Sequence, residues 1–330
     1  MVVAGLFFSV LLAMWIGRYP ICLNKIWQDI SGMILSKNVY GTISTDLQVV
    51  LLRIPRICMA IMVGASLSAS GMVYQCLFRN PLVSPDILGV SSGACLGAAL
   101  AIVFSCHHPF VLQSFAFLFG IIAVLLTYWL ASVSKNRTII TLVMSGIVVS
   151  SFCGALLSLL KYTADPYRQL PEIVFWIMGG LYQVSWQDIY MTFPFVGAGL
   201  LIIFVLRRNL NILSLGDEEA QNLGINVSLI RIIFITVSTV VVGVTICVTG
   251  IIGWVGLVIP HITRILFGIN HTHSLPYAML IGGCFVLWMD TLARSITSQE
   301  IPIGIITALV GAPFFAYLLL FKQNRGWGKW

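Results

Sequence analysis

The sequence predicts an all-α integral membrane protein with about ten transmembrane helices. Of its 330 residues, 59% are hydrophobic and only 9% are charged, and the mean hydropathy is +1.00. A soluble globular domain carries roughly 25% charged residues and could not bury this much apolar surface within itself. The bilayer must therefore be the solvent for most of the chain, and we expect residues 1–330 to form a single polytopic domain.

Ten apolar runs approach the roughly 20 residues, at about 1.5 Å each, that a helix needs to cross a bilayer. The first run follows no basic residue and precedes no clear cleavage site, so it predicts a membrane helix rather than a secretory signal peptide. The run 252–267 is short and contains Pro260, which favours a bent or partial span. The ten predicted spans are 1–17, 51–77, 87–105, 110–133, 138–160, 187–206, 228–250, 252–267, 275–295 and 302–321.

Two longer segments are predicted not to span. Residues 18–50 contain Pro20 and Gly41, and in 161–186 the apolar piece 173–178 is long enough only for a half-helix or re-entrant element on one face. An even number of spans places both termini on one side. If that side is cytoplasmic, about ten of the 18 Lys and Arg residues lie inside, which is a weak positive-inside bias.

Motifs for catalysis or metal binding are missing from the sequence. A Walker A loop and H-E-x-x-H do not occur, we do not interpret Ser91-Ser92-Gly93 as a nucleophile elbow, and the histidines at 107–108 and 271–273 have no nearby cluster of further ligands. The eight cysteines form no C-x-x-C pair and are typical of small buried hydrophobes. The net charge of +7 comes from residues scattered near helix ends, which favours membrane anchoring and protein docking over nucleic acid. We expect no enzyme activity, bound cofactor or metal in this chain.

Transport driven by an ion gradient usually places several ionisable residues inside the membrane. Asp290 is the one candidate in the predicted spans, and Arg294 follows four residues later, where the two can pair on one helical face. Two interpretations are open: the pair stabilises a helix near the membrane edge, or it has a role in function. The chain thus carries neither an ATPase motif nor an evident ion relay, so energy for uphill transport must come from another subunit.

Small residues are concentrated in Gly64–Gly71 and Ser91–Ala99. Such faces let helix backbones approach closely in lipid, which is the interpretation we favour. The alternative is that small, polar faces leave room for a pathway.

The stretch 213–224, LSLGDEEAQNLG, is acidic in a chain with only 11 Asp and Glu residues. It predicts a helix of about nine residues capped by Ser214, with Asp217 three positions later, acids in the first turn and Gly224 at the end. So short a helix is not stable alone, and its apolar side, Leu215, Ala220 and Leu223, is small. It therefore needs a partner surface, although packing on its own membrane domain is an alternative.

The segment 79–94, RNPLVSPDILGVSSGA, resembles the signature of permeases that import iron-siderophores, haem and cobalamin in ATP-binding-cassette systems of the type II importer class. The resemblance continues in order along nearly the whole chain. The further matching stretches are R-x-P-R at 53–56, FWIMGGLYQVSWQDI at 175–189, LSLGDEEAQNLGINV at 213–227, GIIGWVGLVIPHITR at 250–264, MDTLAR at 289–294 and EIPIGIITALVGAPFF at 300–315.

The resemblance implies a homodimer in a bacterial or archaeal cytoplasmic (inner) membrane, with ten membrane helices per copy and both termini cytoplasmic. Two cytoplasmic ATPase subunits, which use ATP and Mg²⁺, would bind below, and a periplasmic or lipoprotein substrate-binding protein would dock above. Segments 18–50 and 161–186 would then be periplasmic, and segment 209–227 would be the cytoplasmic coupling segment. Its coupling residues would be Ser214, Leu215, Gly216, Asp217, Glu218, Glu219, Ala220, Leu223 and Gly224.

By the same resemblance, Arg53, Arg56 and Arg294 would meet acidic residues of the binding protein. Arginine suits this role because its planar fork binds carboxylates in bidentate fashion. Asn80 and Leu82 would lie in a cytoplasmic gate of the pathway. We expect a permease that moves a metal chelate, namely a ferric siderophore, haem or cobalamin. Alternatives are a metal oxyanion such as molybdate in the same transporter class, a self-powered secondary transporter, or an intramembrane enzyme.

Overall fold

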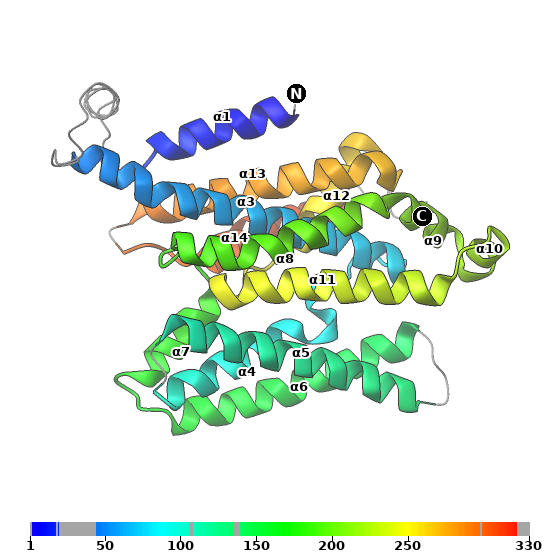
Figure 1. Ribbon diagram of the computed structural model, residues 1–330, viewed down its shortest axis with the longest axis horizontal. Helices are drawn as coiled ribbons and strands as arrows, with labels where there is room; N and C mark the ends of the chain where they lie inside the picture. Colours follow the sequence, from blue (N-terminus) through cyan, green and yellow to red (C-terminus); the bar gives the residue numbers. More distant parts are fainter. Residues whose placement is uncertain are drawn as a thin grey trace.

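The computed structural model describes residues 2–17, 19, 44–105, 108–134, 139–297 and 299–321. Within these ranges the chain forms thirteen α-helices and one short 3-10 helix, with no strand. Figure 1 shows that most of the long helices run side by side along the longest axis of the molecule. The all-α class is therefore confirmed, while most of the predicted non-spanning segment 18–50 lies outside the described residues.

Ten helices correspond to the ten predicted spans. Six of them are long and apolar enough to cross a membrane, and the other four are shorter apolar helices. The six are α3 (Thr45–Leu77), α5 (Pro109–Val133), α6 (Ile139–Thr163), α8 (Trp186–Val205), α11 (Val227–Thr249) and α13 (His271–Ile296). The four are α1 (Val2–Trp15), α4 (Val90–Val103), α12 (Val255–Phe267) and α14 (Ile303–Phe321).

The remaining elements lie between these helices. The short helix α7 (Gln169–Met178) occupies the place where a half-helix was predicted. The 3-10 helix η1 (Pro85–Leu88) leads into α4, and α9 (Arg207–Leu215) and α10 (Asp217–Asn222) lie between α8 and α11. The helix α3 starts at Thr45, six residues before the predicted span, because Ser44 accepts a hydrogen bond from the Leu47 amide and caps it.

The core of the molecule is built around α3, whose second half is almost completely buried. Its close packing depends on glycine, as the small-residue pattern predicted. A Cβ atom on Gly64 would overlap the carbonyl of Gly282 in α13, and one on Gly71 would overlap the carbonyl of Gly256 in α12. In the same way Gly93 of α4 lies against the backbone of Phe119 in α5. These contacts confirm that the small residues allow the helices to pack closely.

Charged side chains of both signs gather at each end of the helix bundle, and we name each end for one feature. We call the end that holds α9 and α10 the acidic end, and the end that holds α7 and the start of α3 the arginine end (Figure 1). The helix α3 connects them, since its 33 residues span about 50 Å at 1.5 Å per residue. Polar side chains that belong to distant parts of the sequence gather at both ends.

Candidate functional site

The acidic stretch forms parts of two helices rather than one. The helix α9 continues through Leu215, and the Ser214 hydroxyl donates to the Asn211 carbonyl at 2.7 Å. The prediction that Ser214 caps the acidic helix is therefore wrong. Ser214 lies inside the last turn of α9, where its hydroxyl is satisfied by the preceding turn.

The acidic helix itself is α10, which begins after Gly216 and ends before Gly224. Gly216 has φ = +143° and ψ = 159°, a conformation that favours glycine, and a Cβ there would overlap the Glu219 carboxylate. At the other end Gly224 has φ = +82°, and the Ile225 amide donates to the Ala220 carbonyl at 3.2 Å. This is a Schellman motif, so the predicted stop at Gly224 is confirmed.

The first of the three acids binds two arginines of the same chain. The Asp217 carboxylate accepts hydrogen bonds from Arg79 Nη2 at 2.8 Å and from Arg231 Nη2 at 2.9 and 3.0 Å. Arg79 follows the end of α3, and Arg231 lies near the start of α11. Asp217 thus joins α10 to two membrane helices.

The other two acids face outward. Glu218 and Glu219 are exposed, and with Leu215 they border a groove of about 540 Å³ between α10, the end of α3 and the start of α6. Leu215 and Leu223 are 61% and 60% exposed, whereas Ala220 is completely buried. An isolated helix of six residues cannot be stable in water, so the buried side and the Asp217 pairs hold α10 in place while its acids and leucines remain accessible.

A second polar contact holds α9. The Asn211 side-chain amide donates to Asn270 Oδ1 and to Thr272 Oγ1, both at 2.9 Å, and its carbonyl accepts from the His271 amide at 2.7 Å. Asn270 is the N-cap of α13. The side chain of Asn211 therefore binds three groups in the first turn of α13, and it was not among the predicted site residues.

The predicted gate residues lie next to Arg79 in the turn that follows α3. Asn80 Oδ1 accepts from the Leu82 amide at 3.0 Å, which is an Asx-turn. Leu82 is 47% exposed, and the next residue, Val83, is buried. Both predicted residues are thus at the surface of the acidic end.

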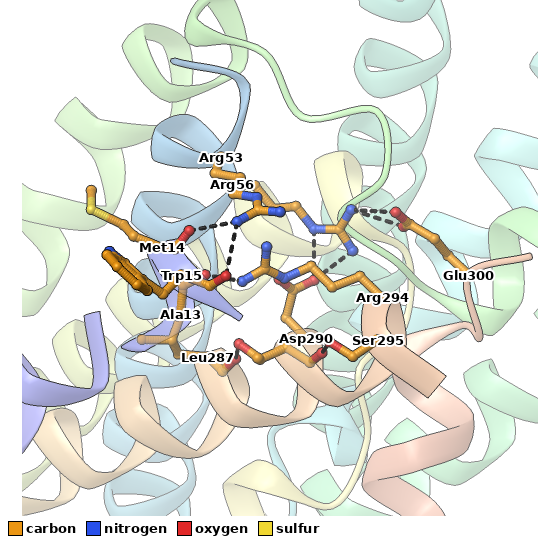
Figure 2. Close-up of polar contacts among 11 residues, drawn as sticks. Ala13, Met14, Trp15, Arg53, Arg56, Leu287, Asp290, Arg294, Ser295 and Glu300 are labelled. Carbon is orange, nitrogen blue, oxygen red and sulfur yellow. Dashed lines mark hydrogen bonds and ion pairs between the residues drawn. The ribbon is translucent and has the colours of Figure 1, made fainter. Parts of the chain in front are cut away.

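The arginine end holds a cluster of alternating charges, shown in Figure 2. Arg56 of α3 binds Asp290 of α13 through Nε and Nη2 at 2.8 and 2.7 Å, and binds both oxygens of Glu300 at 3.0 and 2.8 Å. Arg294 approaches Asp290 at 3.7 Å, which confirms the predicted pair four residues apart. The Asp290 side chain is fully buried, while that of Glu300 is 37% exposed.

The two other predicted docking arginines bind the end of α1. Arg53 donates to the carbonyls of Met14 and Trp15 at 2.5 and 3.5 Å, and Arg294 donates to the Ala13 carbonyl (Figure 2). Arg53 and Arg294 are only 8% and 7% exposed. The three arginines therefore lie close together, and their guanidinium groups face internal partners.

A cavity of about 760 Å³ also lies at the arginine end, between α5, α7, α8 and the end of α11. Aromatic side chains form much of its wall, and Phe175 and Tyr182 contact each other with ring centroids 4.9 Å apart. Burial, with a smaller effect of Glu172, raises the pKa of Tyr182, so its phenol stays protonated at neutral pH. Among the described residues, no group of three or more His, Cys, Asp and Glu side chains could hold a metal.

The chain is similar to known proteins over nearly its whole length. The profile of the FecCD transport family matches residues 5–321. The molybdate import system permease protein MolB of Haemophilus influenzae is 38% identical over 96% of this chain and 93% of its own. A probable iron chelatin transport system permease protein of Helicobacter pylori is also 38% identical, over 91% of this chain and 90% of its own.

A solved structure shares the fold. It is described as an inward-facing conformation of a metal-chelate type ABC transporter, is 36% identical, and superposes with a TM-score of 0.85 over 97% of both chains. The chain therefore belongs to the FecCD transport family and is a multi-pass permease subunit of an ABC importer, not an enzyme.

Proposed function

We propose that two copies of this chain form a permease that imports a metal chelate across a bacterial or archaeal cytoplasmic membrane. Two partner ATPase subunits, which use ATP and Mg²⁺, would bind at the acidic end, and a substrate-binding protein would dock at the arginine end. Both termini would then be cytoplasmic. The observation that carries this proposal is the pair of helices α9 and α10, which presents exposed acids at the end opposite the arginine cluster.

The ATPase would contact the exposed face of α10 and the groove beside it. Glu218 and Glu219 supply negative charge, and Leu215 and Leu223 supply apolar area. A surface that combines exposed leucines with charged residues is typical of protein interfaces. We infer that the ATPase offers an apolar side chain flanked by Lys or Arg.

The binding protein would engage the arginine cluster through carboxylates, in the role assigned to Arg53, Arg56 and Arg294. Arg56 is the best placed of the three, since its partner Glu300 is 37% exposed. A carboxylate of the binding protein would compete with Glu300 for the Arg56 guanidinium. Arg53 and Arg294 would support the site from their positions against α1.

The cavity at the arginine end supports a chelate rather than a bare oxyanion as cargo. Its 760 Å³ lies within the range of sites for drug-sized ligands, and Phe175, Trp176 and Tyr182 provide aromatic walls. Its lining residues include Glu172 and Asp188 but, in the described part of the chain, no Lys or Arg, so a dianion such as molybdate would be repelled. The relatives named for molybdate and for iron chelatin are equally identical to this chain, so identity does not rank the two cargoes.

Reconstitution tests this proposal. The full-length permease, its cognate ATPase and its binding protein would be placed in vesicles and offered a ferric siderophore, haem, cobalamin or molybdate. We expect uptake of one chelate that requires both ATP and the binding protein. Uptake of molybdate alone would contradict the proposed cargo, and uptake driven by an ion gradient without the ATPase would favour a secondary transporter.

A further inference from the structure

The turn after α3 contains an unusual backbone position. The Arg79 and Asn80 amides donate to the Cys76 and Gln75 carbonyls, both at 3.1 Å, which closes the helix with a Schellman motif. Arg79 occupies the left-handed position of that motif with φ = +47°. Glycine is usual there because a side chain is strained in this conformation.

The side chain of Arg79 makes a contact at this strained position that glycine could not make. Its guanidinium binds Asp217 at 2.8 Å, and Asp217 also binds Arg231. The side chains of Arg79, Arg231 and Asp217 are 40%, 24% and 43% exposed, and exposed ion pairs contribute little to stability. The contact therefore adds little to the stability of the whole fold, and its role is to fix the position of α10 against α3 and α11.

Asn211 provides a matching contact on the other side of Gly216. It binds the first turn of α13, whereas Asp217 binds α3 and α11. The two contacts thus lie on α9 and α10, on either side of a residue whose backbone favours glycine. At the arginine end, Arg56 of α3 binds Asp290 of α13, so α3 and α13 are linked to each other there.

We propose that Asp217 and Asn211 are positioning residues that transmit displacement of α10 and α9 to the membrane helices, and that Glu218 does not share this role. Asp217 passes the displacement to α3 and α11, and Asn211 passes it to α13. The inference rests on the proposed function, because the displacement comes from the ATPase. It divides the acidic stretch into one acid that binds two arginines of the same chain and two exposed acids that meet the partner.

The test compares two nearly isosteric changes, Asp217→Asn and Glu218→Gln, in the full-length permease reconstituted with its ATPase and binding protein. For Asp217→Asn we expect ATPase affinity within about twofold of the wild type and a fall of about fivefold or more in cargo moved per ATP hydrolysed. For Glu218→Gln we expect weaker ATPase affinity and an unchanged ratio of cargo to ATP. Equal loss of ATPase affinity in both variants, or a wild-type ratio in Asp217→Asn, would overturn the proposal.

Arg79→Gly separates positioning from stability. Glycine relieves the strain at φ = +47°, so the melting temperature should equal or exceed that of the wild type while the cargo-to-ATP ratio falls as in Asp217→Asn. Adding Arg79→Gly to Asp217→Asn should reduce the ratio no further, because Asp217→Asn already removes the ion pair that Arg79→Gly removes. A further reduction of the cargo-to-ATP ratio in the double variant, or a wild-type ratio in Arg79→Gly, would contradict the positioning role.

Hydrogen exchange of the permease alone tests the contact without the partner. Asp217→Asn should speed exchange of the amides of residues 219–225 by about three- to tenfold, and Glu218→Gln should leave it unchanged. Equal exchange in both variants would overturn the positioning role. If exchange changes as expected but the wild type never binds an ATPase, the proposed function fails while the internal contact stands.

Discussion

Asp217 accepts a hydrogen bond from Arg79 at 2.8 Å, although 138 positions separate the two residues. This contact joins the most acidic segment of the chain to the end of α3, whose second half is almost completely buried. It also pairs one of three consecutive acids with arginines of the same chain. The structure thereby separates residues that look equivalent in the sequence.

The buried Asp290 should be essential to the stability of the arginine end. In Asp290→Asn, Arg56 and Arg294 lose their shared buried counter-charge, and breaking such a pair costs about 3–5 kcal/mol in a fully buried site. Because the Arg56 side chain is 13% exposed, we expect a loss of about 2–4 kcal/mol in the free energy of unfolding. Denaturant unfolding in detergent would measure it.

Glu300→Gln is the matched control, since Glu300 binds the same arginine but is 37% exposed. Glu300→Gln should lower the free energy of unfolding by about 1 kcal/mol or less. Equal destabilisation by the two variants would contradict the view that burial of Asp290, rather than the pairing itself, makes the difference.

Glu300 should also affect docking of the binding protein. Its removal, which slightly lowers stability, should strengthen docking. Removing Glu300 frees one side of the Arg56 fork, so Glu300→Gln should tighten docking by about three- to tenfold, whereas Arg56→Glu should weaken it more than tenfold. Titration of the detergent-solubilised permease with its binding protein measures both. Weaker docking in Glu300→Gln would show that Glu300 helps the partner bind instead of competing with it.

Close packing of α3 on α13 should tolerate no side chain at Gly64. Its Cβ would overlap the Gly282 carbonyl, and overpacking typically costs about 1–3 kcal/mol, so Gly64→Ala should lower the melting temperature by several degrees. Gly154 of α6 is the control, because no atom lies within 4 Å of its added Cβ. Gly154→Ala should be neutral or stabilising, and equal melting temperatures of the two variants would contradict the packing argument.

Hydropathy was sufficient to predict the spans but not all of their boundaries. Apolar runs of about 20 residues leave few other solutions in a bilayer, so the ten helices follow from composition. The start of α3 was missed because Asp46 and Gln48 are polar, although Ser44 before Asp46 is a recognisable capping signal. At Ser214 the capping pattern was misleading, since α9 continues through it.

The candidate sites were predictable only as segments. The acidic stretch and the arginines stand out in the sequence, but the residues that they bind lie far away in it. Arg56 and Asp290 are 234 positions apart, and Asn211 and His271 are 60 apart. Local patterns carry no information about such contacts, so Arg79, Arg231, Asn211 and Glu300 were not assigned to these roles.

The central claim is that α10 receives a partner ATPase, and its most direct test is the affinity of that ATPase for a permease with Glu218→Lys and Glu219→Lys. Membrane insertion should be unaffected because both residues lie outside the spans. A matched pair of single changes, Glu218→Lys and Glu172→Lys, alters the net charge equally at opposite ends of the bundle. Affinity would be measured by titration in nanodiscs, with ATP-dependent uptake in vesicles as the second readout.

We expect the double change to weaken ATPase binding at least tenfold, to abolish uptake and to leave the protein folded, and Glu172→Lys to leave the affinity unchanged. Wild-type affinity and uptake in the permease with both charges reversed would contradict the account.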